Sequence, residues 1–132
     1  METNPERAAT EAELMDQEPY LLDSKRRAAV LESIREVCLH REWTLLAAHV
    51  RTTHVHAIVE AQSKPEKIMN DFKSYASRKL NRLECDTQSR KRWAHHGSTR
   101  WLFEDENVRQ AIKYVVEEQG EPMAVFVTEE VI

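Results

Sequence analysis

The residues of this 132-residue chain that are best suited to chemistry are two histidines. His54 and His56 lie in the segment THVHAIVE, which is predicted to be a β-strand. Side chains two residues apart on a strand point to the same face, so the two imidazoles are predicted to lie side by side. Two imidazoles can share one divalent metal ion when a third ligand comes from elsewhere in the fold. The alternative is a pair of ordinary half-buried histidines.

A tyrosine and an acid form a second candidate group. Tyr114 and Glu118 are four residues apart in a predicted helix and therefore share one of its faces. The Glu118 carboxylate, or the neutral oxygen of Gln119, would complete the metal site. Tyrosine hydroxyls in general, with a reference pKa of ~10, are poor nucleophiles at neutral pH, but a metal ion can polarise a phosphodiester and orient it for attack. The product would be a covalent phosphotyrosine link. The alternative is a packed Tyr114 and a solvated Glu118; Tyr75 is a rival nucleophile, but neither an acid nor an amide follows it four residues later.

The elements that must position these groups can be predicted from apolar spacing, capping residues and turns. They are a helix over 24–40, strands over 43–50 and 53–60, a helix over 65–83, a strand over 98–103, a helix from 104 to about 120 and a strand over 123–128. This order favours an α+β fold with helices packed on a mostly antiparallel sheet. Residues 1–19 are predicted to be an acidic flexible tail, and 20–128 a single domain.

Charge is strongly segregated within a net charge of −4. Residues 61–100 contain 10 Lys or Arg and 4 Asp or Glu, a net charge of +6. A basic segment of this kind is typical of proteins that bind a polyanion such as nucleic acid, although it also fits a solvated helix face. The candidate phosphate contacts are Lys64, Lys73, Arg78, Arg90, Lys91, Arg92, His96 and Arg100.

Composition excludes several classes of protein. The chain contains no run of 18 apolar residues, so no membrane span is expected. Its acidic N-terminal region contains no apolar segment of the kind that a secretory signal requires. Cys38 and Cys85 are far apart, which fits a reduced cytoplasmic setting better than a disulfide framework. Only 2 glycines are present, which excludes Gly-rich phosphate-binding loops.

Three separated pieces of the chain carry a resemblance to a known family. HVRTTHVHAIVEAQSKPEKIMNDFKSYASRKLNR and RWAHHGSTRWLFEDENVRQAIKYVVEEQGEPMAVF contain, in order, a His-hydrophobic-His strand, the helix motif D-F-K-x-Y-A-S-R and an H-G-S-T-R loop before the tyrosine helix. Over residues 20–127 the chain resembles the single-tyrosine HUH transposases, and most of all the REP-associated tyrosine transposases.

The resemblance implies a ferredoxin-like (RRM-like) palm and metal-dependent cleavage and rejoining of single-stranded DNA, often beside a hairpin. It implies that His54 and His56 bind Mg²⁺ or Mn²⁺ and that Tyr114 forms a 5′-phosphotyrosine. The third ligand would follow the tyrosine by four residues, at Glu118, where relatives often have Gln or Asn; Gln119 is the neighbouring alternative. Several members of the family are homodimers in which the tyrosine helix of one subunit serves the histidines of the other. The resemblance therefore allows a homodimer and leaves open whether the site is formed within one subunit or between two.

One departure from the family pattern concerns the start of the domain. Members usually begin with a strand inside the sheet, but the apolar content before Ser24 is concentrated in Tyr20-Leu21-Leu22. The first strand is therefore predicted to be missing. This favours an alternative function, a catalytically inactive nucleic-acid-binding module of the same fold. A third alternative is a metal-dependent hydrolase that uses water and does not require Tyr114.

Overall fold

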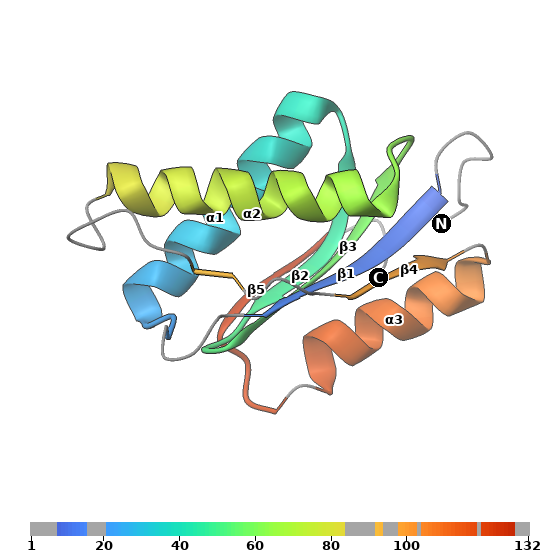
Figure 1. Cartoon of the computed structure of the whole chain (residues 1–132). Coiled ribbons are helices and arrows are strands. Elements are labelled where there is room, and N and C mark those ends of the chain that lie inside the picture. Colours follow the sequence, from blue (N-terminus) through green and yellow to red (C-terminus); the bar gives the residue numbers. More distant parts are fainter. Residues whose placement is uncertain are drawn as a thin grey trace.

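The computed structural model describes residues 8–15, 21–83, 92–93, 98–102, 104–118 and 120–128. Eight elements follow one another along these residues (Figure 1). They are β1 (Ala8–Met15), α1 (Ser24–Arg41), β2 (Thr44–Val50), β3 (His54–Ala61), α2 (Pro65–Arg82), β4 (Ser98–Leu102), α3 (Asp105–Glu117) and β5 (Ala124–Val127).

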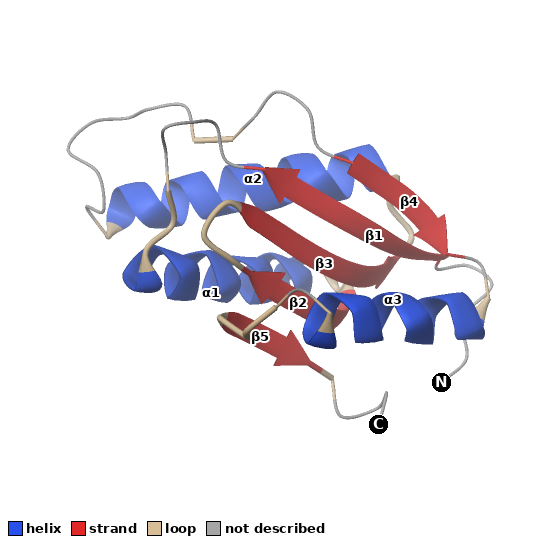
Figure 2. Ribbon diagram, turned by 90° about the horizontal axis from the view of Figure 1, so that it is seen from below, coloured by secondary structure: helices blue, strands red, loops and turns tan. Residues whose placement is uncertain are grey.

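The strands form one antiparallel sheet in the order β4-β1-β3-β2-β5. The first six elements, β1 to β4 with α1 and α2, have the ferredoxin-like connection, and α3 with β5 extends it at the β2 edge. Helices α1 and α2 lie on one face of the sheet and α3 on the other (Figures 1 and 2). The predicted α+β fold with helices on an antiparallel sheet is confirmed.

The prediction that the first strand is missing is wrong. Ala8–Met15 forms β1, which pairs with β3 on one side and with β4 on the other. Of the predicted flexible tail, these eight residues belong to the sheet, whereas residues 1–7 and 16–19 lie outside the described residues. The segment forms a strand because its side chains point alternately to the two faces of the sheet, and the small alanines among them fit beneath the helices. Ala12 and Leu14 are buried in the core, and Glu11 and Glu13, which alternate with them, point to the opposite face.

The other predicted elements agree with the structure to within about three residues at each end, the usual uncertainty of such boundaries. Helix α1 begins where Asp23 accepts a hydrogen bond from the backbone N–H of Arg26 at 2.9 Å, as a capping residue does. Helix α2 begins with Pro65 in its first turn. Helices α1 and α2 are each 18 residues long and carry many charges. Within the described part of the chain, no helix is long and apolar enough to cross a membrane.

The sheet separates two hydrophobic cores. Alternate residues of β3, Val55, Ala57 and Val59, belong to the core beneath α1 and α2, together with Phe72 of α2. Ile58 belongs to the second core, beneath α3. Because both faces are covered, most of β2 and β3 is buried, although antiparallel strands often have one solvated face. The face beneath α3 is the one that carries the candidate chemistry.

Candidate active site

His54 and His56 share the sheet face beneath α3, as the alternation along β3 predicts. Their ring centroids are 6.3 Å apart, with the planes tilted by 39°. His54 is half-buried at the start of the strand, where its Nδ1 lies 3.0 Å from the hydroxyl of Thr53. His56 is 6% exposed. The strand therefore presents one accessible imidazole and one buried imidazole to the same region.

The apolar stripe of α3 determines where Tyr114 lies. The stripe consists of four buried residues, Val108, Ala111, Ile112 and Val115. Tyr114 is at the border of this stripe, so its ring is 45% exposed and yet lies next to the sheet. Its ring centroid is 6.1 Å from that of His56, and the planes are nearly perpendicular at 78°. The structure thus brings the phenol and the imidazoles together within a single protomer.

The predicted third ligands are less well placed. Glu118 ends α3, where its backbone N–H donates to the carbonyl of Tyr114 at 3.1 Å, and its side chain is exposed. Among the residues that the structure describes, no three His, Cys, Asp or Glu side chains form a group that could hold a metal ion. Glu118 is therefore not gathered with the histidines into a ready-made ligand set. Gln119 lies outside the described residues.

A carboxylate that the sequence analysis missed contacts the histidine pair. The register of β1 and β3 places Glu13 directly opposite His56, and residues opposite each other in a sheet share a face. The Glu13 carboxylate is 3.0 Å from Nε2 of His56. Glu11 lies on the same face, two residues earlier in β1. The alternation of Glu11 and Glu13 with apolar residues is the signal in the sequence, although the acidic composition of residues 1–19 equally fits a tail.

Burial controls the charge state of His56. Desolvation lowers its pKa below the ordinary value, and the nearby carboxylates of Glu13 and Glu11 oppose this shift. His56 is therefore neutral at neutral pH, with a hydrogen on one ring nitrogen and a lone pair on the other. Its Nδ1 is buried and has no hydrogen-bond partner among the described residues. Buried polar atoms in proteins nearly always contact a protein group, a water molecule or an ion, so this nitrogen is a candidate metal ligand.

His49 is a second residue that the sequence analysis missed, because it lies within the strand segment WTLLAAHV. It is fully buried on β2, directly opposite His56. Its Nε2 accepts from the backbone N–H of Met123 at 3.0 Å, so its Nδ1 carries the hydrogen and donates to the carbonyl of Val115 at 2.9 Å. Burial lowers the pKa of His49, which favours this neutral form. The ring thereby ties β2 to the helical turn beside Tyr114 and to the connection into β5.

Three of the predicted phosphate contacts belong to the α2 region, on the opposite side of the sheet from α3. Lys64 precedes α2 and is exposed. Arg78 is also exposed, with its guanidinium 4.6 Å from the centroid of the Tyr75 ring. Lys73 is partly buried, and desolvation lowers its pKa. Tyr75, the rival nucleophile, packs against the core beneath α1 and α2, so the sheet separates it from the histidines.

The remaining phosphate candidates differ from this group. Arg92 is 2% exposed, and its guanidinium donates to the side chain of Asn81 at 2.9 Å and to the carbonyl of Ser77 at 3.5 Å. These internal bonds leave a phosphate contact from Arg92 without support in the structure. Arg100 lies on β4, opposite Glu11 in the register, but its side chain is not among those described. Arg90, Lys91 and His96 lie outside the described residues.

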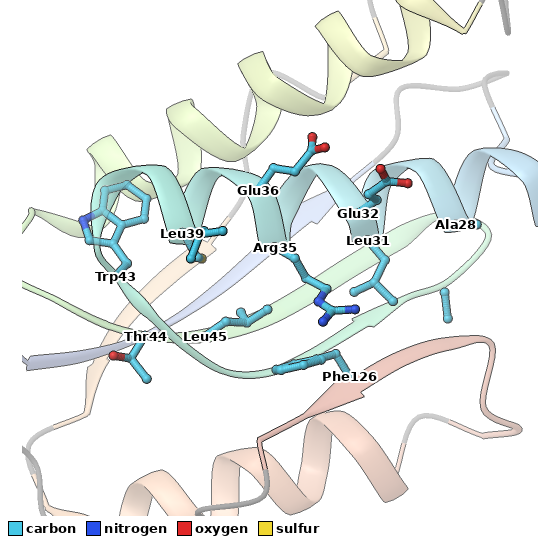
Figure 3. Close-up of a pocket in the computed structure, with 12 residues that line it drawn as sticks. Ala28, Leu31, Glu32, Arg35, Glu36, Leu39, Trp43, Thr44, Leu45 and Phe126 are labelled. Atoms are coloured by element: carbon cyan, nitrogen blue, oxygen red, sulfur yellow. The ribbon is translucent and has the colours of Figure 1, made fainter.

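A groove of about 810 Å³ lies on the other side of the sheet from the histidines, between α1 and the strands β2 and β5 (Figure 3). Leu31, Leu45 and Phe126 are among its lining residues. Arg35 reaches from α1 toward Phe126, with its guanidinium 4.9 Å from the ring centroid. This contact connects α1 to the edge strand β5. The groove contains neither the histidine pair nor Tyr114 and is separate from the candidate active site.

Comparison with known proteins gives a family match and two structural likenesses. The family profile described as "Transposase IS200 like" matches residues 16–119. A solved structure of a REP-associated tyrosine transposase bound to a REP hairpin is similar, with a TM-score of 0.66 and 11% identity over 84% of this chain and 66% of that one. A candidate transposase from Deinococcus radiodurans R1 has a TM-score of 0.63 and 15% identity over 86% of this chain and 91% of that one. These two likenesses show the fold. The chain spans slightly less than two thirds of the first structure, at 66% of its length, and no curated protein matches it.

Proposed function

Because the chain belongs to the IS200-like transposase family, we propose that it cleaves and rejoins single-stranded DNA with Tyr114 as the nucleophile. The observation that carries this proposal is the 6.1 Å separation between the rings of Tyr114 and His56, on the face that also holds His54. The phenol is 45% exposed, so a DNA strand can reach it. Both groups come from one chain, which supports an active site that does not need a second subunit.

The proposed reaction is an in-line displacement at phosphorus. The Tyr114 hydroxyl loses its proton and its oxygen bonds to the phosphorus, while the bond from phosphorus to the 3′ oxygen of the preceding nucleotide breaks. That oxygen takes up a proton and leaves as a 3′ hydroxyl. The new bond from the tyrosine oxygen to phosphorus replaces the one that is broken. A second 3′ hydroxyl can therefore attack the 5′-phosphotyrosine, which forms a new DNA phosphodiester and releases Tyr114.

The residues present fit a divalent cation, which we propose to be Mg²⁺ or Mn²⁺. The Nδ1 of His56 is buried and has no hydrogen-bond partner in the part of the chain that the structure describes, which makes it a ready donor, and the His54 ring lies beside it on the same face. When bound, the cation would offset the negative charge that develops on the phosphate. His54 and His56 would hold it, and the third ligand is proposed to be Glu118 or Gln119 at the end of the tyrosine helix.

We propose hairpin DNA as the substrate. The first structural relative is bound to a hairpin, as its name states, and residues 61–100 of this chain carry a net charge of +6. Lys64, Lys73 and Arg78 are the described candidates for a backbone contact. They lie on the opposite side of the sheet from α3, so they would bind a part of the hairpin away from the phosphodiester that Tyr114 attacks. Binding through such groups should weaken as salt rises, because each neutralised phosphate releases counterions. Assembly as a homodimer and a cytoplasmic location stay predictions.

The alternative of an inactive binding module loses its main support. It depended on the absence of the first strand, and β1 is present between β3 and β4. The inactive module is therefore kept as an outcome of the test below. The water-using hydrolase is a second such outcome, because it would not require Tyr114.

The test is incubation of the full chain with single-stranded hairpin DNA, labelled at both ends, in the presence of Mn²⁺. We expect a covalent protein–DNA adduct that Tyr114→Phe abolishes. Tyr75→Phe is the matched control, because Tyr75 lies on the opposite side of the sheet and its variant should still form the adduct. Cleavage that persists in Tyr114→Phe would identify the hydrolase instead, and binding without cleavage would identify the module.

A further inference from the structure

We propose that Glu13 is a positioning residue of the active site: its carboxylate fixes the hydrogen of His56 on Nε2 and leaves the lone pair of Nδ1 available to a metal ion. The metal-binding role given to His56 here rests on the proposed function. The contact between Glu13 and His56 does not, because it is observed within the described sheet.

Glu13 has a fixed place in the sheet. It lies on β1, opposite His56 of β3, and its side chain is 30% exposed. Neighbours on both sides hold β1, since it pairs with β3 and with β4. The carboxylate is therefore carried by a central strand rather than by a loop, and this gives it a fixed approach to the imidazole.

The contact between the two side chains determines which ring nitrogen carries the hydrogen. The distance from Nε2 of His56 to the Glu13 carboxylate is 3.0 Å, which is within the range of a hydrogen bond. A carboxylate can only accept, so Nε2 of the neutral ring must carry the hydrogen. Nδ1 then holds the lone pair, and it is this atom that is buried without a hydrogen-bond partner among the described residues.

The position of this hydrogen has a consequence for a metal ion. A neutral imidazole binds a cation through its unprotonated nitrogen, and histidine ligands usually donate their other N–H to a carboxylate or carbonyl. Such partners orient the ring and raise the basicity of the ligating nitrogen. Glu13 supplies this second contact to His56 from a strand, independently of the residues that follow Tyr114.

The experiment is ¹⁵N NMR of the histidine rings in the full, metal-free and DNA-free chain at about pH 8, where ordinary histidine is neutral. We expect wild-type His56 to carry its hydrogen on Nε2. Glu13→Val removes the acceptor but suits a strand, and it should produce a mixture of the two tautomers. Glu13→Gln retains an acceptor oxygen and should retain the Nε2–H form. Glu11→Gln is the matched control, because it removes the same charge from the same face and should leave the tautomer of His56 unchanged.

The second readout is the affinity for Mn²⁺ alone, from a calorimetric titration. Loss of an orienting partner usually weakens metal binding by about 10- to 100-fold, and we expect a loss in this range for Glu13→Val. An Nδ1–H tautomer in the wild type would overturn the proposal even if the variant failed to fold. So would a weakened Mn²⁺ affinity without a change of tautomer, since Glu13 would then be a direct ligand. Tyr114→Phe should keep the Nε2–H tautomer, so failure of the proposed cleavage and failure of this inference are distinguishable.

Discussion

Replacing His49 tests whether a buried histidine holds the tyrosine helix against the sheet. In the native protein its ring satisfies the carbonyl of Val115 at 2.9 Å and the backbone N–H of Met123 at 3.0 Å. Leucine has a similar volume but no hydrogen-bonding atoms. His49→Leu therefore leaves both backbone groups without this partner, next to Tyr114.

The magnitude follows from the cost of unsatisfied buried groups. Each one costs about 1–3 kcal/mol. The bond to Val115 is buried and the bond from Met123 is partly buried, so water can recover some of the second. We expect His49→Leu to lower the free energy of unfolding by about 2–4 kcal/mol. His49→Gln carries both a donor and an acceptor and should recover part of this loss.

The assay is urea unfolding at neutral pH, followed by circular dichroism, with the slope of free energy against urea checked for each variant. His40→Leu is the matched control, because His40 is exposed on α1 and its replacement should change stability by less than about 0.5 kcal/mol. A His49→Leu variant as stable as this control would refute the role assigned to the ring. In the DNA adduct assay, folded His49→Leu should also react more slowly, since Val115 adjoins Tyr114.

Three further predictions concern other parts of the fold. Leu14→Ala should lower the free energy of unfolding, measured with urea, by about 2–5 kcal/mol, because Leu14 is fully buried in β1. Met15 is exposed, so Met15→Ala is the control and should have little effect; equal effects would contradict the central position of β1. Lys79 lowers the pKa of Glu32 below 4.5, and its own pKa is raised above 10.5. The ion pair between Lys79 and Glu32 therefore stabilises the fold fully between pH 4.5 and pH 10.5. The stabilisation is lost as the pH falls through the lowered pKa of Glu32 or rises through the raised pKa of Lys79. Thermal melts of Lys79→Met should show a weaker pH dependence at both ends. Burial raises the pKa of the Cys38 thiol to about 12, so iodoacetamide at about pH 8 should label it slowly until the protein is unfolded, as peptide mass spectrometry would show.

Local patterns predicted the parts of the fold whose faces differ strongly in polarity. The apolar stripe of α3 is regular, and the expected helix from 104 to about 120 was found as Asp105–Glu117. Along β3, His54 and His56 alternate with Val55 and Ala57, and this spacing alone predicted the common face of the histidines. These signals are local because each depends on the geometry of a single element.

β1 could not be predicted by the same reasoning. The segment AATEAELM contains neither aromatic nor β-branched residues apart from Thr10, so its intrinsic preference for a strand is low. Its stability comes from pairing with β3 and β4, which lie far away in the sequence. The roles of Glu13 and of the buried Arg92 were invisible for a related reason, since each depends on a partner that only the folded chain brings near.

The residues missed by sequence reasoning share one row of the sheet. Glu13 of β1 and His49 of β2 are the two cross-strand neighbours of His56 on β3, and side chains opposite one another in adjacent strands share a face. On one side, Glu13 fixes the ring of His56 through Nε2; on the other, His49 holds the turn of α3 beside Tyr114. Registers set by three strands therefore determine how the nucleophile and the candidate metal ligand face each other. A shift of β1 or β2 by a single residue would turn either neighbour to the opposite face of the sheet, which makes the register itself a requirement of the proposed chemistry.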